Sequence, residues 1–136
     1  MSRALLLFSA LCIATLTSQV AQAASLKEEQ LAQRLQQLAQ ASSQGTPRNL
    51  NEQITDNGFS VDGITLVNHL SVSPEHAAQM QDYPNAIREQ LTASVCRTPN
   101  FVSLLRNGAQ LRYEFTEKGS NRLVAVERYD AADCSL

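Results

Sequence analysis

Two cysteines, Cys96 and Cys134, constrain the fold of this chain most, because a bond between them would tie the end of a helix to the C-terminus. The stretch TASVCRTPNF, residues 92–101, places Cys96 at the end of a helical pattern, and Thr98-Pro99 begins another helix. Neither the C-x-x-C spacing of a redox pair nor a base beside a reactive thiol is visible in the sequence. We therefore predict a structural disulfide, with a metal ligand or a nucleophile as the alternatives.

The N-terminus supports this pairing because it has the three-part layout of a secretory signal peptide. Arg3 supplies the positive start, residues 4–16 are mostly apolar, and Ala21-Gln22-Ala23 is an A-x-A cleavage signal. The apolar run is too short to span a bilayer. We predict cleavage near Ala23 and a mature protein that is periplasmic or secreted, in an oxidising compartment where cysteines pair. Cys12 would leave with the signal peptide.

The composition narrows the function classes. The chain has 136 residues and a net charge of −2, which becomes more negative when Arg3 is removed. No run of Lys or Arg forms a basic patch, so we expect no nucleic-acid partner. No further stretch is apolar enough for a membrane span.

Residues 24–46 are predicted to form an N-terminal amphipathic helix. Ser25 and Glu28 have the spacing of a capping box, and Gly45 with Thr46-Pro47 ends the pattern. A leucine stripe follows at helical spacing, formed by Leu31, Leu35 and Leu38. It is either a face buried in the core or, if exposed, a candidate partner-binding surface.

Residues 47–136 are predicted to form an α+β domain. A hairpin is expected within residues 53–72, closed by a turn at Asn57-Gly58 or at Asp62-Gly63. A helix begins at Ser73-Pro74 and is interrupted at Tyr83-Pro84, since proline cannot donate a backbone hydrogen bond. It resumes up to Cys96, and a short helix follows Thr98-Pro99.

The last segment, AQLRYEFTEKGSNRLVAVERY, predicts a second hairpin around Gly119-Ser120. A two-residue turn there would pair Phe115 with Val124 and Tyr113 with Val126. The same register would pair Glu117 with Arg122 and Arg112 with Glu127, so apolar and charged pairs agree. The predicted fold is thus an antiparallel sheet of about four strands (two hairpins) with helices packed on one face and one disulfide.

The segment from Cys96 to Cys134 also carries a family resemblance. A helix ending in Cys96, then LLRNG, then LRYEFTEKGSNRLVAVERYDAADC, resembles small exported proteins of Gammaproteobacteria. They are grouped as the putative quorum-sensing-regulated virulence factor family. The resemblance implies a secreted or periplasmic α+β protein with a disulfide and no established enzymatic activity. It carries over no catalytic residue.

Few residues suggest chemistry. His69 and His76 could meet at a metal, but two histidines and the neighbouring Glu75 lack a recognised ligand spacing. Asp130 and Asp133 lie just before the last cysteine and are expected to be turn residues rather than cation ligands. Nucleophile-elbow, phosphate-loop and H-E-x-x-H motifs are absent. We therefore expect no enzyme, no cofactor and no metal site.

The sequence favours a binding function. The first hypothesis is an exported non-enzymatic interaction protein, such as a secreted virulence-associated factor of a Gram-negative bacterium, with a protein partner that the sequence does not identify. The second is a periplasmic inhibitor or immunity-type protein that binds a toxin or an envelope hydrolase. A third, an envelope hydrolase, would need a polar pocket near His69. The oligomeric state is left open.

Overall fold

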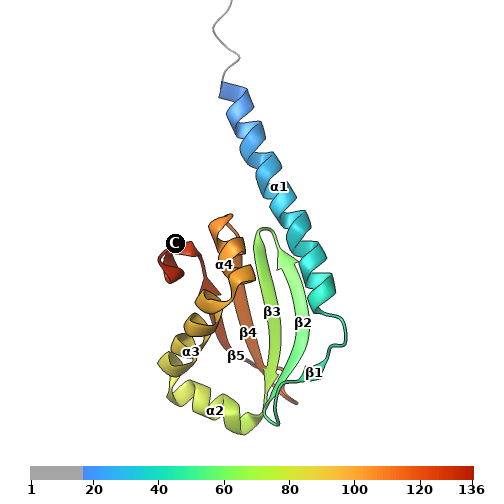
Figure 1. Cartoon of the computed structure of the whole chain (residues 1–136). Helices are drawn as coiled ribbons and strands as arrows, with labels where there is room; N and C mark the ends of the chain where they lie inside the picture. The colour runs from blue at the N-terminus through green and yellow to red at the C-terminus, as the bar shows by residue number, and fades with distance from the viewer. Residues whose placement is uncertain (1–16) are drawn as a thin grey trace, which may run out of the picture.

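The computed structural model describes residues 17–136 and is a five-stranded sheet with helices along it (Figure 1). The elements in chain order are α1 (Thr17–Ser42), β1 (Arg48–Asn49), β2 (Ile54–Asp62), β3 (Thr65–Val72), α2 (Pro74–Asp82), α3 (Pro84–Arg97), α4 (Pro99–Arg106), β4 (Gln110–Glu117), β5 (Leu123–Tyr129) and the 3-10 turn η1 (Ala131–Cys134). Residues 1–16 of the predicted signal peptide, with Cys12, lie outside the described residues. Residues 17–23 belong to α1, and the cleavage near Ala23 stays a prediction.

The predicted α+β class is confirmed. The sheet differs from the predicted one in having one more strand and in having one pair of strands that run parallel. The strand order is β1-β2-β3-β4-β5, so the short β1 adds to the four predicted strands. The β3–β4 pair is parallel, whereas the other pairs are antiparallel. A parallel pair needs a long crossover because the chain must return to the same end of the sheet. Here α2, α3 and α4 form that crossover.

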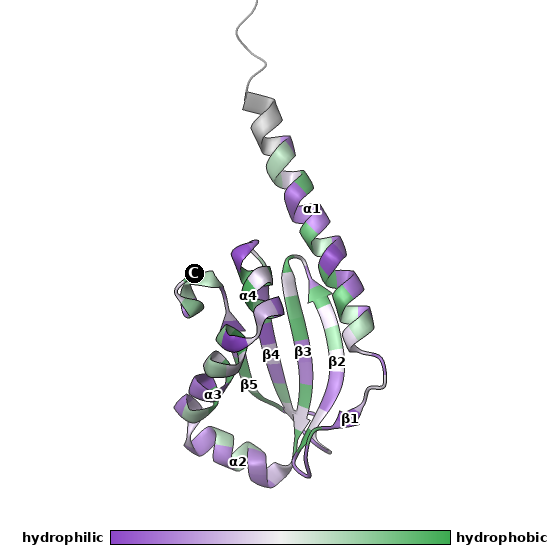
Figure 2. Ribbon diagram, viewed as in Figure 1, coloured by the Kyte–Doolittle hydropathy of each residue, from purple (hydrophilic) through white to green (hydrophobic). Residues whose placement is uncertain are grey.

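The helices lie on one face of the sheet and bury a common core. α1 packs on β2 and β3, α2 packs on β4 and β5, and α4 packs on β4. Alternate residues of the strands face the helices. The main core cluster lies between the helices and the sheet and takes residues from both: Leu35, Ala39, Leu66, Val95, Leu104, Leu105, Ala109, Leu111 and Tyr129. Across residues 17–136 no helix has both the length and the apolar character to cross a membrane. Figure 2 shows hydrophilic and hydrophobic residues alternating along α1.

The first hairpin closes at Asp62-Gly63, one of the two turns considered. β2 and β3 pair from Ile54↔Val72 to Asp62↔Thr65. Asn57-Gly58 instead marks a bulge, where the register shifts between Asp56 and Phe59. Gly58 has φ +100°, and a Cβ there would lie 3.0 Å from the hydroxyl oxygens of Ser43 and Thr46. This glycine therefore lets β2 approach the end of α1 closely.

The interrupted helix is also confirmed. The Ser73 hydroxyl accepts a hydrogen bond from the backbone N–H of His76 at 3.2 Å and caps α2. α2 ends at Asp82 and α3 begins at Pro84, so the chain turns at Tyr83. Tyr83 is 69% exposed at this corner.

The predicted register of the second hairpin is wrong by one residue along most of its length. Glu117 and Arg122 pair next to the turn as predicted, with carboxylate and guanidinium 2.8 Å apart. A bulge between Phe115 and Thr116 then shifts the pairing, so that Phe115 faces Ala125 and Tyr113 faces Glu127. The turn is also wider than two residues, with positive φ at both Gly119 and Asn121. Because a one-residue slip reverses the faces of a strand, Glu127 points to the helix side.

The disulfide joins Cys96 and Cys134, as predicted. The two cysteines are 38 residues apart, and the bond connects the last turn of α3 to η1. In the chain-entropy model a loop of this size contributes about 4 kcal/mol to the free energy of unfolding. That is a large part of the roughly 5–15 kcal/mol that stabilises a small domain.

The leucine stripe of α1 packs against the sheet. Leu35 is 0% exposed within the core, and Leu31 and Leu38 are partly buried beside it. Of the two alternatives for the stripe, Leu35 takes the core position, because its side chain has no exposed surface. The helix itself ends at Ser42 rather than at residue 46.

We predict that Leu35→Ala lowers the free energy of unfolding by about 2–5 kcal/mol, because it leaves a cavity in the core. Leu26→Ala is the matched control, since Leu26 lies on the same helix and is 58% exposed. It should change the stability by no more than about 0.5 kcal/mol. Urea denaturation followed by circular dichroism measures both variants. Equal, small effects would contradict the packing of α1 on the sheet.

Candidate functional site

A groove between α1 and α4 is formed by two neighbouring cavities. One cavity, of about 520 Å³, is lined by residues of the outer part of both helices: Lys27, Gln30, Leu31, Arg34, Arg106 and Asn107. A second, of about 320 Å³, is lined further along the same helices by Arg34, Gln37, Leu38, Asn100, Ser103 and Leu104. Arg34 lines both, so the two cavities adjoin. We call their combined lining the α1–α4 groove.

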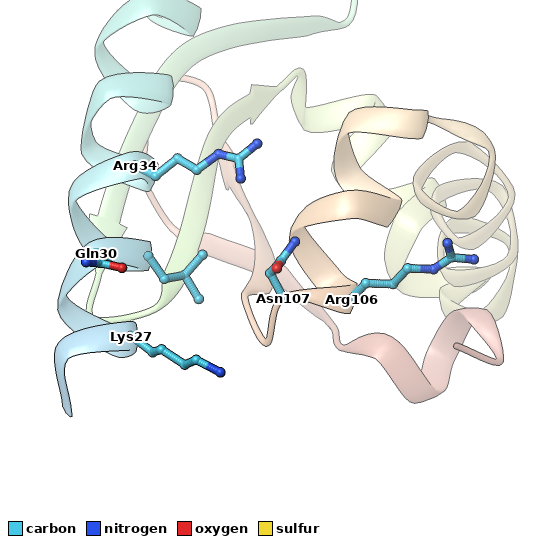
Figure 3. Close-up of a pocket in the computed structure, with 6 residues that line it drawn as sticks. Lys27, Gln30, Arg34, Arg106 and Asn107 are labelled. Carbon is cyan, nitrogen blue, oxygen red and sulfur yellow. The ribbon is translucent and has the colours of Figure 1, made fainter. Parts of the chain in front are cut away.

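The walls of the groove differ in charge and polarity. Lys27 and Arg34 point from α1 toward α4 (Figure 3). Asn107 lies at the end of α4, and its Nδ2 donates a hydrogen bond to the Ser103 backbone oxygen at 2.7 Å. Arg106 also lines the groove, but its guanidinium points away from α1 (Figure 3). No Asp or Glu is among the lining residues. The groove is thus a cationic site on a chain whose net charge is −2.

The remaining leucines of the stripe contribute the apolar part. Leu31 lines the first cavity and Leu38 the second, while both also pack against the core. The structure thus separates the three leucines, with Leu35 in the core and the other two at the base of the groove. Their role in binding a partner stays a prediction.

The polar residues of the groove were not predicted from the sequence. The positions of Lys27 and Arg34, seven residues apart on one helical face, could have been noticed beside the leucines. The α4 wall, with Asn100, Ser103 and Asn107, could not have been assigned to the same site. α4 comes to lie beside α1 only because the chain crosses over between the parallel strands β3 and β4.

His69 belongs to a polar network on the other face of the sheet. Its Nε2 lies 2.6 Å from the Ser60 hydroxyl oxygen, and its Nδ1 lies 3.5 Å from a Glu114 carboxylate oxygen. The other Glu114 oxygen accepts a hydrogen bond from Arg112 Nε at 2.9 Å. The three strands β2, β3 and β4 each contribute a residue to this row.

The order serine–histidine–carboxylate is that of a hydrolytic triad, but the surroundings differ. Ser60 lies within the regular β2–β3 ladder, which runs from Phe59 to Asp62, and not on a strand-to-helix turn. His69 and Glu114 are also open to solvent, with side-chain exposures of 42% and 29%. The network joins β2, β3 and β4 through side chains on this face of the sheet.

The two histidines do not meet. His76 lies in the first turn of α2, on the helix side of the sheet, and lines a separate cavity with Met80 and Ile87. Within residues 17–136 no three metal-ligating side chains come together. The structure therefore gives no support to the metal-site alternative among these residues.

The comparisons with known proteins decide the family. The family model described as putative quorum-sensing-regulated virulence factor matches residues 24–135. The chain belongs to this family. The resemblance inferred from residues 96–134 is thus confirmed over a longer range, which begins one residue after Ala23.

Solved structures show the same fold. A putative secreted protein from Pseudomonas aeruginosa is 47% identical to this family member, with a TM-score of 0.78, and the match covers 80% of this chain and 96% of that one. Type II secretion system pilotins from Vibrio vulnificus and Vibrio cholerae are 17% and 16% identical, with TM-scores of 0.71 and 0.67. Each match covers 82% of this chain and 98% or 99% of the pilotin. The pilotins establish a shared fold. Among curated proteins, none matches the chain.

In this virulence-factor family member, a second polar cluster fastens α3 to the C-terminal segment. Arg88 pairs with Glu127 at 3.2 Å and with Asp133 at 2.8 Å, and its guanidinium lies 4.2 Å from the centre of the Tyr129 ring. Asp130 and Asp133 form a capping box around η1, as expected of turn residues. Burial alone would lower the pKa of Arg88, but Tyr129, Glu127 and Asp133 outweigh it and raise that pKa. The cluster is therefore structural.

Tyr113 provides a pH-dependent measure of this packed region. Its ring meets Tyr129 edge to face, with centroids 6.1 Å apart. Burial, with a smaller contribution from Tyr129, raises the pKa of Tyr113 from 10.0 to about 12. The folded protein thus holds the phenol proton more tightly than the unfolded chain. The stabilisation is complete below pH 10 and is lost as the pH rises toward 12.

We predict that the free energy of unfolding falls between pH 10 and pH 12, and that Tyr113→Phe makes this fall smaller, because the variant has no phenol to ionise at this position. Tyr83→Phe is the matched control, since Tyr83 is exposed, and it should retain the full decrease. Urea titrations at a series of pH values measure the difference. An unchanged decrease in Tyr113→Phe would show that the phenol is not held in a buried, neutral form.

Proposed function

We propose that this protein is an exported, non-enzymatic interaction protein that holds a partner protein in the α1–α4 groove. The groove is the single observation that carries the proposal, because it combines a concave shape, an apolar base and polar walls. Leu31 and Leu38 would be the apolar anchors, and Leu35 would support them from the core. The polar network around His69 gives no comparable support for an enzyme.

Export rests on the N-terminus and on the family. The sequence predicts cleavage near Ala23, and the family match starts at residue 24. The Pseudomonas aeruginosa relative is described as a putative secreted protein, and a disulfide suits an oxidising compartment. The pilotins add, at the level of the fold, that this architecture occurs in components of a secretion system. The proposed location is the periplasm or the medium.

A photo-crosslinking amino acid placed in the groove tests this function in living cells. Gln37 and Ser103 are suitable positions, because they line opposite walls of the groove and are exposed. Ser120, exposed in the β4–β5 turn, is the control position. We expect the same crosslinked protein from both groove positions and none from Ser120. Products from all three positions alike, or no product from the groove, would refute the proposal.

The inhibitor alternative has an observation of its own. An inhibitor commonly inserts an exposed aromatic side chain into its target, and Tyr83 is 69% exposed at the α2–α3 corner. The same crosslinker placed at Tyr83 separates the two functions. Products from Tyr83 and not from the groove would favour the inhibitor, whereas products from the groove alone would favour the interaction protein.

A further inference from the structure

We propose that the α1–α4 groove selects a partner helix in which acidic and apolar residues alternate at intervals of four and three. The inference rests on the proposed function and goes further by naming the chemistry of the bound segment. It is based on the order of side chains along α1, on their unpaired charges and on the axial distances between them.

The α1 wall presents one regular row of side chains. Lys27, Leu31, Arg34 and Leu38 follow one another at steps of four, three and four residues, which keeps them on one face of the helix. All four line the groove. The wall therefore offers a cation, an apolar group, a second cation and a second apolar group in turn.

The cations of this row are free to bind an external carboxylate. Lys27 and Arg34 are exposed, and in the part of the chain that the structure describes neither forms an ion pair. The facing wall carries neutral polar side chains, among them Asn100, Ser103 and Asn107. An acidic segment would therefore meet two positive charges and no lining carboxylate, whereas a basic segment would be repelled.

The spacing fits a helix better than a strand. At 1.5 Å per residue, Leu31, Arg34 and Leu38 lie about 6, 10.5 and 16.5 Å from Lys27 along the axis of α1. A partner helix laid along α1 has side chains at these same intervals. In a strand, side chains on one face recur every 6.6 Å or so, and by the third position the mismatch with Arg34 is about 2.7 Å. The walls are also helices, so they offer no strand edge for backbone pairing.

The partner segment would thus carry Asp or Glu seven residues apart, with Leu-like residues four positions after each acid or, if it runs the other way, four positions before. Its acids would meet Lys27 and Arg34, and its apolar residues would cover Leu31 and Leu38. The row from Lys27 to Leu38 is about 16 Å long, so the segment needs about three to four turns of helix.

Three synthetic peptides of about fourteen residues test this chemistry, with Ala and Gln at all other positions to favour a helix. The first has the Glu and Leu spacing described, the second has Lys in place of each Glu, and the third has Ser in place of each Leu. Fluorescence anisotropy measures their binding to the purified full-length protein. We expect the Lys and the Ser peptides to bind about tenfold or more weakly than the first.

A charge-reversal variant makes the test specific to the groove. Lys27→Glu with Arg34→Glu should reverse the preference, so that the Lys peptide binds better than the Glu peptide. Lys118→Glu with Arg128→Glu is the matched control. Lys118 directly follows β4 and Arg128 lies in β5, both outside the groove, and neither forms an ion pair within residues 17–136. It should leave the preference unchanged. Circular dichroism verifies that both variants fold.

Several outcomes would overturn the inference. Equal binding of the Glu and Lys peptides would remove the role of charge, and equal binding of the Ser peptide would remove the role of the leucines. Displacement of the Glu peptide by inorganic phosphate, or equally by anionic phospholipid vesicles, would show a general anion site instead. If crosslinking from Gln37 and Ser103 still captures a partner in cells, the proposed function survives these failures. If that crosslinking fails, the function falls whatever the peptides do.

Discussion

The parallel pairing of β3 with β4 is the constraint on which the rest of the structure depends. It runs in register from Thr65↔Gln110 to Val72↔Glu117, so the chain must leave one end of the sheet and re-enter at the other. α2, α3 and α4 cover that distance on the face that α1 also covers, and α4 comes to lie across from α1 (Figure 1). An antiparallel pair would need only a short turn. The groove exists because this pair is parallel.

A long crossover has a conformational entropy cost, and two features offset it here. The disulfide fixes the end of α3 to η1, so the last helix of the crossover begins from an anchored point. Arg88 of α3 also forms ion pairs with Glu127 in β5 and with Asp133 in η1. The Tyr129 hydroxyl donates a hydrogen bond to the Arg88 backbone oxygen at 3.2 Å. Both contacts join α3 to segments that follow it in the chain. The α4 wall of the groove is therefore held without any contribution from the groove itself.

The features that could be predicted from the sequence are the ones set by neighbouring residues. The break at Tyr83-Pro84 and the capping at Ser73 each need only a few adjacent side chains. The turn of the first hairpin was narrowed to two dipeptides, and Asp62-Gly63 is the one that closes it. The parallel β3–β4 pair could not be predicted, because the residues of a strand do not determine which distant strand pairs with it. The bulge at Phe115 was missed for a related reason. Pairing Tyr113 with Val126 looked best within the hairpin, but Glu127 gains the Arg88 contact from another element.

The residues that line the groove differ in what they contribute to the fold. Leu31 and Leu38 pack against the core, so replacing them would confuse lost binding with lost stability. Lys27 and Arg34 form no ion pair within residues 17–136, so reversing their charge breaks none. If the chain is cleaved near Ala23, Lys27 falls in the first turn of α1, where free backbone N–H groups also favour a carboxylate.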